Sequence, residues 1–117
     1  MVSEKRAIER EKLDRELKFF RIAGKKASYY PHWLRRVRLA LGAHVTDIAR
    51  DLGVNKSVIH RLEKSEDKKA ISLNSLEKAA GAMDCKLVYA IVPRGGKTIL
   101  ELAERQQWRR KLANKED

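Results

Sequence analysis

Residues 46–64 have the sequence TDIARDLGVNKSVIHRLEK, which predicts two short helices joined by a tight turn. The first helix has one narrow apolar face, made by Ile48, Ala49 and Leu52. Gly53 follows at once and supplies the positive φ with which a helix can end and reverse direction. Asn55 can cap the second helix, because its side-chain oxygen accepts from free amides of the first turn. This order of residues is typical of a helix-turn-helix.

The second helix should have one buried side and one polar side. We expect Ile59 and Leu62 to be buried, and Val54 to pack back into the core beside them. The outward-facing residues would then be Lys56, Ser57, His60, Arg61 and Lys64. A polar loop over residues 65–70 should follow this helix. An αα-hairpin that binds no DNA has the same apolar pattern and stays an alternative.

This stretch resembles the helix-turn-helix of the phage-repressor family. The positions that match are Ile48, Ala49, Leu52, Gly53, Val54, Ile59, Leu62 and Glu63. Two positions depart from the family pattern: His44 stands where a Ser or Thr N-cap is usual, and Val45 where a glutamine commonly contacts the DNA backbone. The resemblance implies a mainly α fold, a repressor-like helix-turn-helix bundle that binds double-stranded DNA.

The resemblance also implies an ion pair. In the phage-repressor family, an arginine of the first bundle helix pairs with the glutamate at the end of the recognition helix. Here these residues are Arg38 and Glu63, and we expect their pair to have a structural role.

The composition suits a small protein with a polyanionic partner. The 117 residues are 43% hydrophobic, enough for one small core but not for two. The net charge of +11 favours nucleic acid. Cys85 is the only cysteine, so no intrachain disulfide can form, and a cytoplasmic location fits best. We expect no membrane span, because no apolar run approaches about 18 residues, and no signal peptide.

The chain should have three parts. Residues 1–30 are expected to be a charged helical arm, helical over 4–22 and ended by Gly24, followed by a linker that contains Tyr29 and Tyr30 and leads to Pro31. Residues 31–84 should be the helix-turn-helix DNA-binding domain. Residues 85–117 should be a strand and a terminal helix that serve dimerisation.

Two further helices should complete the DNA-binding domain. The first lies within residues 31–42, where Gly42 ends it and Leu34, Val37 and Leu41 form its apolar stripe. The second is capped by Ser72, and its core residues should be Leu73, Leu76, Ala80 and Met83.

A single C-terminal β-strand is expected over residues 86–92, KLVYAIV, which are β-branched and aromatic. A single strand cannot provide hydrogen-bond partners for its own backbone N–H and C=O groups. The simplest pairing partner is therefore the same strand of a second chain. The dimer strand would comprise Leu87, Val88, Tyr89, Ala90, Ile91 and Val92. Thr98 and Glu101 form a capping box, so the terminal helix should begin there and run to about Leu112. Its inward residues should be Ile99, Leu102 and Ala103, and we expect Cys85 to be buried.

A longer stretch of the chain resembles the mobile mystery protein A family. The similarity lies in an N-terminal charged helix, WLRRVR, RLEKSE and the later CKLVYAIVP, and covers most of residues 8–94. Members of that family resemble helix-turn-helix regulators and are typically encoded beside a Fic-domain protein. The resemblance implies an operon regulator, the antitoxin half of a toxin–antitoxin pair, with a Fic-domain toxin as partner.

The DNA contacts are assigned from the expected orientation of the second helix. Base contacts are expected from Lys56, Ser57 and Arg61. Backbone contacts are expected from Arg35, Arg36, His44, Thr46, Asn55, His60 and Lys64. A homodimer of such domains would bind a palindromic operator.

No catalytic set is recognisable, so we expect no enzyme activity, no cofactor and no metal site. His32, His44 and His60 lack cysteines or carboxylates at metal-ligand spacing. Two functions therefore remain open. One is a sequence-specific repressor of its own operon, and the other is an interaction protein that neutralises a neighbouring Fic-like toxin with weak or no DNA binding.

Overall fold

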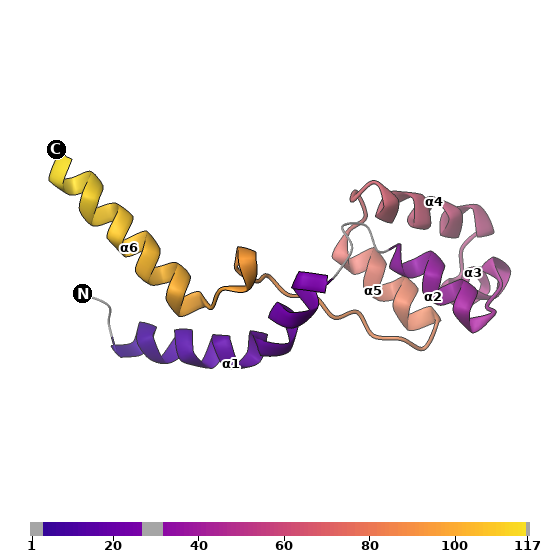
Figure 1. The fold of residues 1–117 in the computed structure, drawn as a ribbon. Coiled ribbons are helices and arrows are strands. Elements are labelled where there is room, and N and C mark those ends of the chain that lie inside the picture. Colours follow the sequence, from indigo (N-terminus) through magenta and orange to yellow (C-terminus); the bar gives the residue numbers. More distant parts are fainter. Residues whose placement is uncertain (1–3, 27–31, 117) are drawn as a thin grey trace. The chain divides into compact units, whose positions relative to one another are not determined.

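The computed structural model describes residues 4–26 and 32–116, which form two compact units (Figure 1). One unit comprises Met1–Ala27 with Ala90–Asp117, and the other comprises Ser28–Tyr89. We call them the hairpin unit and the bundle unit and describe each by itself. The expectation of a mainly helical fold is confirmed, since six α-helices contain most of the described residues.

The bundle unit contains four helices around a small apolar core. They are α2 (Trp33–Leu41), α3 (Val45–Leu52), α4 (Lys56–Asp67) and α5 (Leu73–Ala82). Helix α3 packs against α4 and α5, and α2 packs against the same two helices. The core is centred on Ile48, Ala49 and Ile59, which are at most 4% exposed.

The helix ends of the bundle unit follow local chemistry. Gly42 and Gly53 both have φ near +68°, the left-handed conformation in which glycine carries no steric cost. After Gly53 the Val54 N–H donates to the Ala49 carbonyl at 2.9 Å, which closes the end of α3. The Ser72 hydroxyl accepts from the Ser75 N–H at 3.1 Å and caps α5. These turns are where the sequence predicts them.

Four residues expected in the core are exposed. Leu41 is 58% exposed, Leu73 50% and Val54 39%. Each of them lies at or beside the end of a helix, where the neighbouring helices of a small bundle no longer cover the apolar stripe. Cys85 is exposed as well, and its thiol donates to the Met83 carbonyl at 3.4 Å.

The predicted β-strand is wrong. The segment that contains Leu87, Val88, Tyr89, Ala90, Ile91 and Val92 has no regular secondary structure. A strand is stabilised by a backbone ladder, and no second strand occurs in residues 32–116 or 4–26 to supply one. The composition of this segment indicates residues that fit a sheet, but it does not show whether a second strand is present to pair with them.

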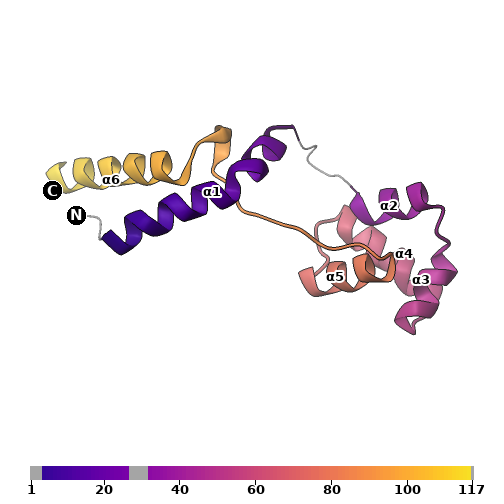
Figure 2. The same ribbon diagram turned by 90° about the horizontal axis from the view of Figure 1, so that it is seen from below.

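The hairpin unit contains two long helices that run in opposite directions. Helix α1 (Glu4–Lys26) packs against α6 (Ile99–Glu116) and against the short 3-10 helix η1 (Arg94–Gly96). Figure 2 shows α1 and α6 side by side from a second direction. Leu17 is 7% exposed and is the buried centre of α1.

Both helices of the hairpin unit are longer than the sequence indicates. Helix α1 continues through Gly24 to Lys26, so Gly24 does not end it, because glycine in a helix lowers its stability without forcing a break. Helix α6 continues past Leu112 to Glu116. The predicted linker residues Tyr29, Tyr30 and Pro31 lie outside the described residues.

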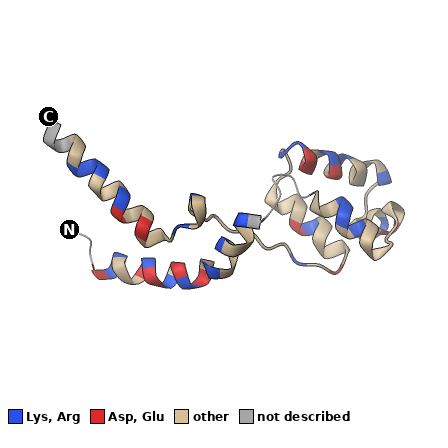
Figure 3. Cartoon of the chain, viewed as in Figure 1, with Lys and Arg blue, Asp and Glu red and all other residues tan. Residues whose placement is uncertain are grey.

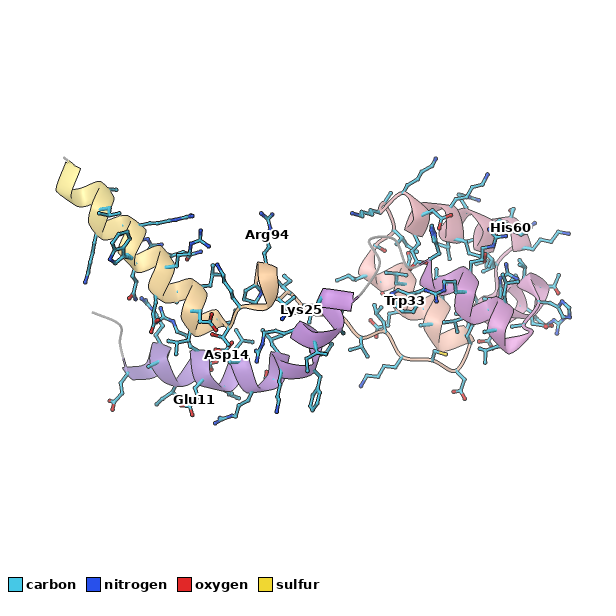
Figure 4. All side chains as sticks on the ribbon, viewed as in Figure 1. Glu11, Asp14, Lys25, Trp33, His60 and Arg94 are labelled. Carbon is cyan, nitrogen blue, oxygen red and sulfur yellow. The ribbon has the colours of Figure 1, made fainter. Side chains whose placement is uncertain are left out.

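A carboxylate of α1 caps α6. The Ile99 N–H donates to Asp14 Oδ1 at 2.7 Å, and the Leu100 N–H donates to Oδ2 at 3.2 Å. Figure 4 shows Asp14 between the two helices. The Glu101 N–H donates to Thr98 Oγ1 at 3.1 Å, so the predicted cap is present as well. Asp14 therefore satisfies two of the free amides at the start of α6 and ties that end to α1.

Replacing Asp14 tests this cap. Asp14→Ala should lower the free energy of unfolding by about 1–2 kcal/mol, because two helix amides lose a charged acceptor. Amide hydrogen exchange should speed up at Ile99 and Leu100. The matched control is Glu11→Ala, which removes an exposed carboxylate of the same helix whose side chain is 74% exposed. Equal stability of the two variants would contradict the capping role.

Candidate nucleic-acid interface

Helix α4 separates its residues into a buried face and an exposed basic face. Ile59 is 3% exposed and Glu63 is 7% exposed, while Val58 and Leu62 are half-buried. The opposite face is exposed and carries Lys56, Ser57, His60, Arg61 and Lys64, which we call the outer face. Figure 3 shows basic residues along this helix. All five residues that the sequence assigned outward therefore lie on one solvent-facing surface.

The start of α4 favours an anion. Asn55 Oδ1 accepts from the Ser57 N–H at 3.1 Å, so the predicted N-cap is confirmed. The first turn contains no acidic residue and begins with Lys56. The partial positive charge of the helix N-terminus thus adds to that of a lysine, which suits a phosphate or the acceptor edge of a base.

The expected ion pair fixes α4 on α2. Arg38 Nε donates to Glu63 Oε2 at 3.0 Å, and Arg38 Nη2 donates to Oε1 at 2.9 Å. The two side chains are 12% and 9% exposed. Hydrogen bonding to Glu63 raises the pKa of the Arg38 guanidinium above its ordinary value. The planar guanidinium group of Arg38 and the carboxylate of Glu63 must lie in one plane to form both bonds. This requirement fixes the rotation of α4 about its own axis.

Two further acidic residues of α4 hold the start of α2. The Leu34 N–H donates to Glu66 Oε1 at 2.9 Å, and the Trp33 N–H donates to Oε2 at 3.2 Å. Asp67 Oδ1 lies 2.5 Å from His32 Nδ1. Glu66 thus accepts hydrogen bonds from free amides at the start of α2, as an N-cap side chain normally does. We call Glu63, Glu66 and Asp67 the acidic clamp.

The sequence analysis missed most of this clamp. Residues 65–70 were expected to be a loop, but α4 continues to Asp67. The signal was present, because Glu63, Glu66 and Asp67 are spaced i, i+3 and i+4 and therefore share one side of a helix. What the sequence could not show is that the start of α2 lies opposite that side.

The start of α3 explains one departure from the repressor pattern. Val45 is half-buried and packs against the core of Ile48, Ala49 and Ile59. Its side chain therefore contributes packing and cannot replace the hydrogen bond of a glutamine. His44 is the N-cap residue of α3 and makes no side-chain cap bond. Both His44 and Thr46 are exposed.

Helix α2 presents two more cations. Arg35 and Arg36 are exposed, as expected. The Arg36 guanidinium carbon lies 5.3 Å from the ring centroid of Trp33, a cation–π distance that restricts the arginine side chain. The structure thus places all the predicted DNA-contacting residues on the surface of the bundle unit, and their contacts with DNA stay predictions.

Two other kinds of feature, a metal-binding cluster and a membrane-spanning helix, are not found in the part of the chain that the structure describes. Among residues 4–26 and 32–116, no group of three or more His, Cys, Asp or Glu side chains is arranged to bind a metal ion. Over the same residues, no helix is both long enough and apolar enough to span a bilayer.

Comparisons with family models, with curated proteins and with solved structures found no match to this chain. The two family resemblances therefore stay hypotheses, and function has to be argued from the geometry of the bundle unit.

The Arg38–Glu63 pair can be tested by removing one or both partners. Glu63→Ala should lower the free energy of unfolding by about 3–5 kcal/mol, because it leaves a largely buried guanidinium unpaired. Combining Arg38→Met with Glu63→Leu should recover most of that loss. Arg50→Ala is the control: its pair with Asp47 is 3.7 Å long and exposed, so the change should stay within about 0.5 kcal/mol. Urea unfolding followed by circular dichroism measures all three.

Proposed function

We propose that this chain is a sequence-specific regulator that binds double-stranded DNA with the outer face of α4 in the major groove. One observation carries the proposal. Glu63 and Glu66 of α4 bond to α2, and Asp67 pairs with His32 directly before α2. The lysines and the arginine in the rest of α4 are exposed. The surface that remains for a partner is therefore positively charged and rich in hydrogen-bond donors, as a groove-binding helix requires.

The outer face has the side chains that base recognition needs. Arg61 and Lys56 can each donate to O6 and N7 of guanine, and the Ser57 hydroxyl can donate or accept at any base edge. Lys56 and Ser57 lie in the first turn of α4 and Arg61 one turn further on. In helix-turn-helix complexes it is the N-terminal part of the recognition helix that reaches the bases.

The surrounding polar residues suit phosphates. We assign backbone contacts to Arg35, Arg36, His44, Thr46, Asn55, His60 and Lys64, all of which are exposed. Such contacts would supply affinity that does not depend on sequence and falls with salt.

The regulated gene is proposed to be the chain's own. A homodimer would bind a palindromic operator whose half-sites lie about one helical turn, or a multiple of it, apart. The resemblance to mobile mystery protein A supports repression of an operon that includes a Fic-domain toxin, with this cytoplasmic chain as the antitoxin.

A second candidate function is favoured by Val45. Because this residue packs in the core, α3 lacks the polar side chain that commonly contacts the DNA backbone at its start. Weak or absent DNA binding would leave an interaction protein that neutralises a Fic-like toxin directly. Co-expression with the neighbouring gene product and purification of a stable complex would support that alternative.

Two matched substitutions test the proposed DNA contacts. Arg61→Ala should cost about 1–3 kcal/mol on the operator and relax the preference at one or two base pairs. Lys64→Ala should weaken operator and random duplexes alike and lower the salt slope of the binding constant by about one. Fluorescence anisotropy at two salt concentrations, with DNA from upstream of the gene, measures both.

The contrast between the variants decides the assignment. Equal weakening of operator and random DNA by Arg61→Ala would show that α4 does not contact bases. No binding by the unmodified chain to any duplex would favour the interaction protein instead.

A further inference from the structure

The hairpin unit buries very little of its own apolar surface. Leu17 is the one buried apolar residue among the described positions of α1. In contrast, several large apolar side chains of the two helices are between 38% and 76% exposed, namely Ile8, Leu13, Phe19, Ile22, Leu100, Trp108 and Leu112. Two helices with so small a core rarely stay folded without a further partner, because burial has to offset the conformational entropy of the chain.

The exposed face of α6 has the spacing of a helix-pairing surface. Glu101, Glu104, Trp108 and Lys111 follow each other at intervals of three, four and three residues and therefore share one side of the helix. Trp108 is 65% exposed, and Leu112 beside it is 43% exposed. With 18 residues α6 is about 27 Å long, which is ample for a helix–helix contact.

The charges on this face fit a second copy of the same helix. On this face the acidic residues Glu101 and Glu104 precede Trp108, and the basic residue Lys111 follows it. Figure 3 shows acidic residues only near the start of the described part of α6, with basic residues further along it. Glu104 and Lys111 lie seven residues apart, so both flank Trp108 on the same side of the stripe. When two such helices pair antiparallel about a two-fold axis, Glu104 of one copy lies opposite Lys111 of the other, and the contact occurs twice.

From these observations we propose that the hairpin unit is a dimerisation module in which α6 pairs antiparallel with α6 of a second copy, centred on Trp108. The two hairpins would then form a four-helix arrangement that covers the exposed apolar residues of α6. This inference stands on the hairpin unit alone. It supplies the two-fold symmetry that the proposed operator requires, but it does not depend on DNA binding.

Charge exchange tests the register in the full chain without DNA. Glu104→Lys and Lys111→Glu should each raise the dimer dissociation constant by about tenfold, because two attractive pairs become repulsive. An equimolar mixture of the two variants should associate nearly as tightly as the unmodified chain. In that mixed dimer both contacts join opposite charges again. Residues 104 and 111 of one helix are two turns apart, so a contact within one chain would not explain such a rescue.

Trp108→Ala tests the apolar part of the proposed contact. It should weaken the dimer at least tenfold, since the ring lies at the centre of the contact. Trp33→Ala is the matched control, because Trp33 is an equally large side chain, 55% exposed, in the bundle unit. Circular dichroism verifies that each variant keeps its helices.

Sedimentation equilibrium gives the dissociation constants. Rescue in the mixture, together with a selective effect of Trp108→Ala, would support the α6 pair. A monomeric unmodified chain at tens of micromolar would overturn it, and so would a mixture as weak as its components or an equal effect of Trp33→Ala. None of these outcomes bears on whether α4 binds DNA.

Discussion

The bidentate pair between Arg38 and Glu63 is the contact on which the geometry of the bundle unit depends. Its two bonds are 2.9 and 3.0 Å long, and it is enclosed on most sides by the helices that it joins. Because the pair lies on the inner side of α4, it determines which residues face outward. Glu66 and Asp67 continue the same side and hold the start of α2. These carboxylates therefore orient α4 and leave its basic residues on the exposed outer face.

The same device occurs in the hairpin unit. Asp14 of α1 accepts from the first two amides of α6, as Glu66 of α4 accepts from the first two of α2. In both units a helix start is satisfied by a carboxylate from another helix. In a small chain such caps matter, because leaving a helix end uncapped lowers the free energy of unfolding by about as much as removing a buried methyl group.

Sequence reasoning succeeded where a structure depends on neighbouring residues. Gly53 and the caps Asn55 and Ser72 depend on residues within one turn, so their patterns were sufficient. The contact of Asp14 joins residues 85 positions apart and left no local pattern. The strand over residues 86–92 was wrong because β-propensity describes a side chain's fit to a sheet that must already exist. The exposure of the outer face was predicted correctly. In a helix of known period, one buried residue determines which of the other residues face solvent.

The central claim is that the outer face of α4 meets DNA, and an NMR titration of the full chain with the upstream duplex tests it most directly. The account predicts that amide shifts concentrate in residues 55–64, with smaller shifts near residues 44–46, and that added salt reverses them. Shifts confined to residues 4–26 and 99–113, with residues 55–64 unmoved, would contradict it.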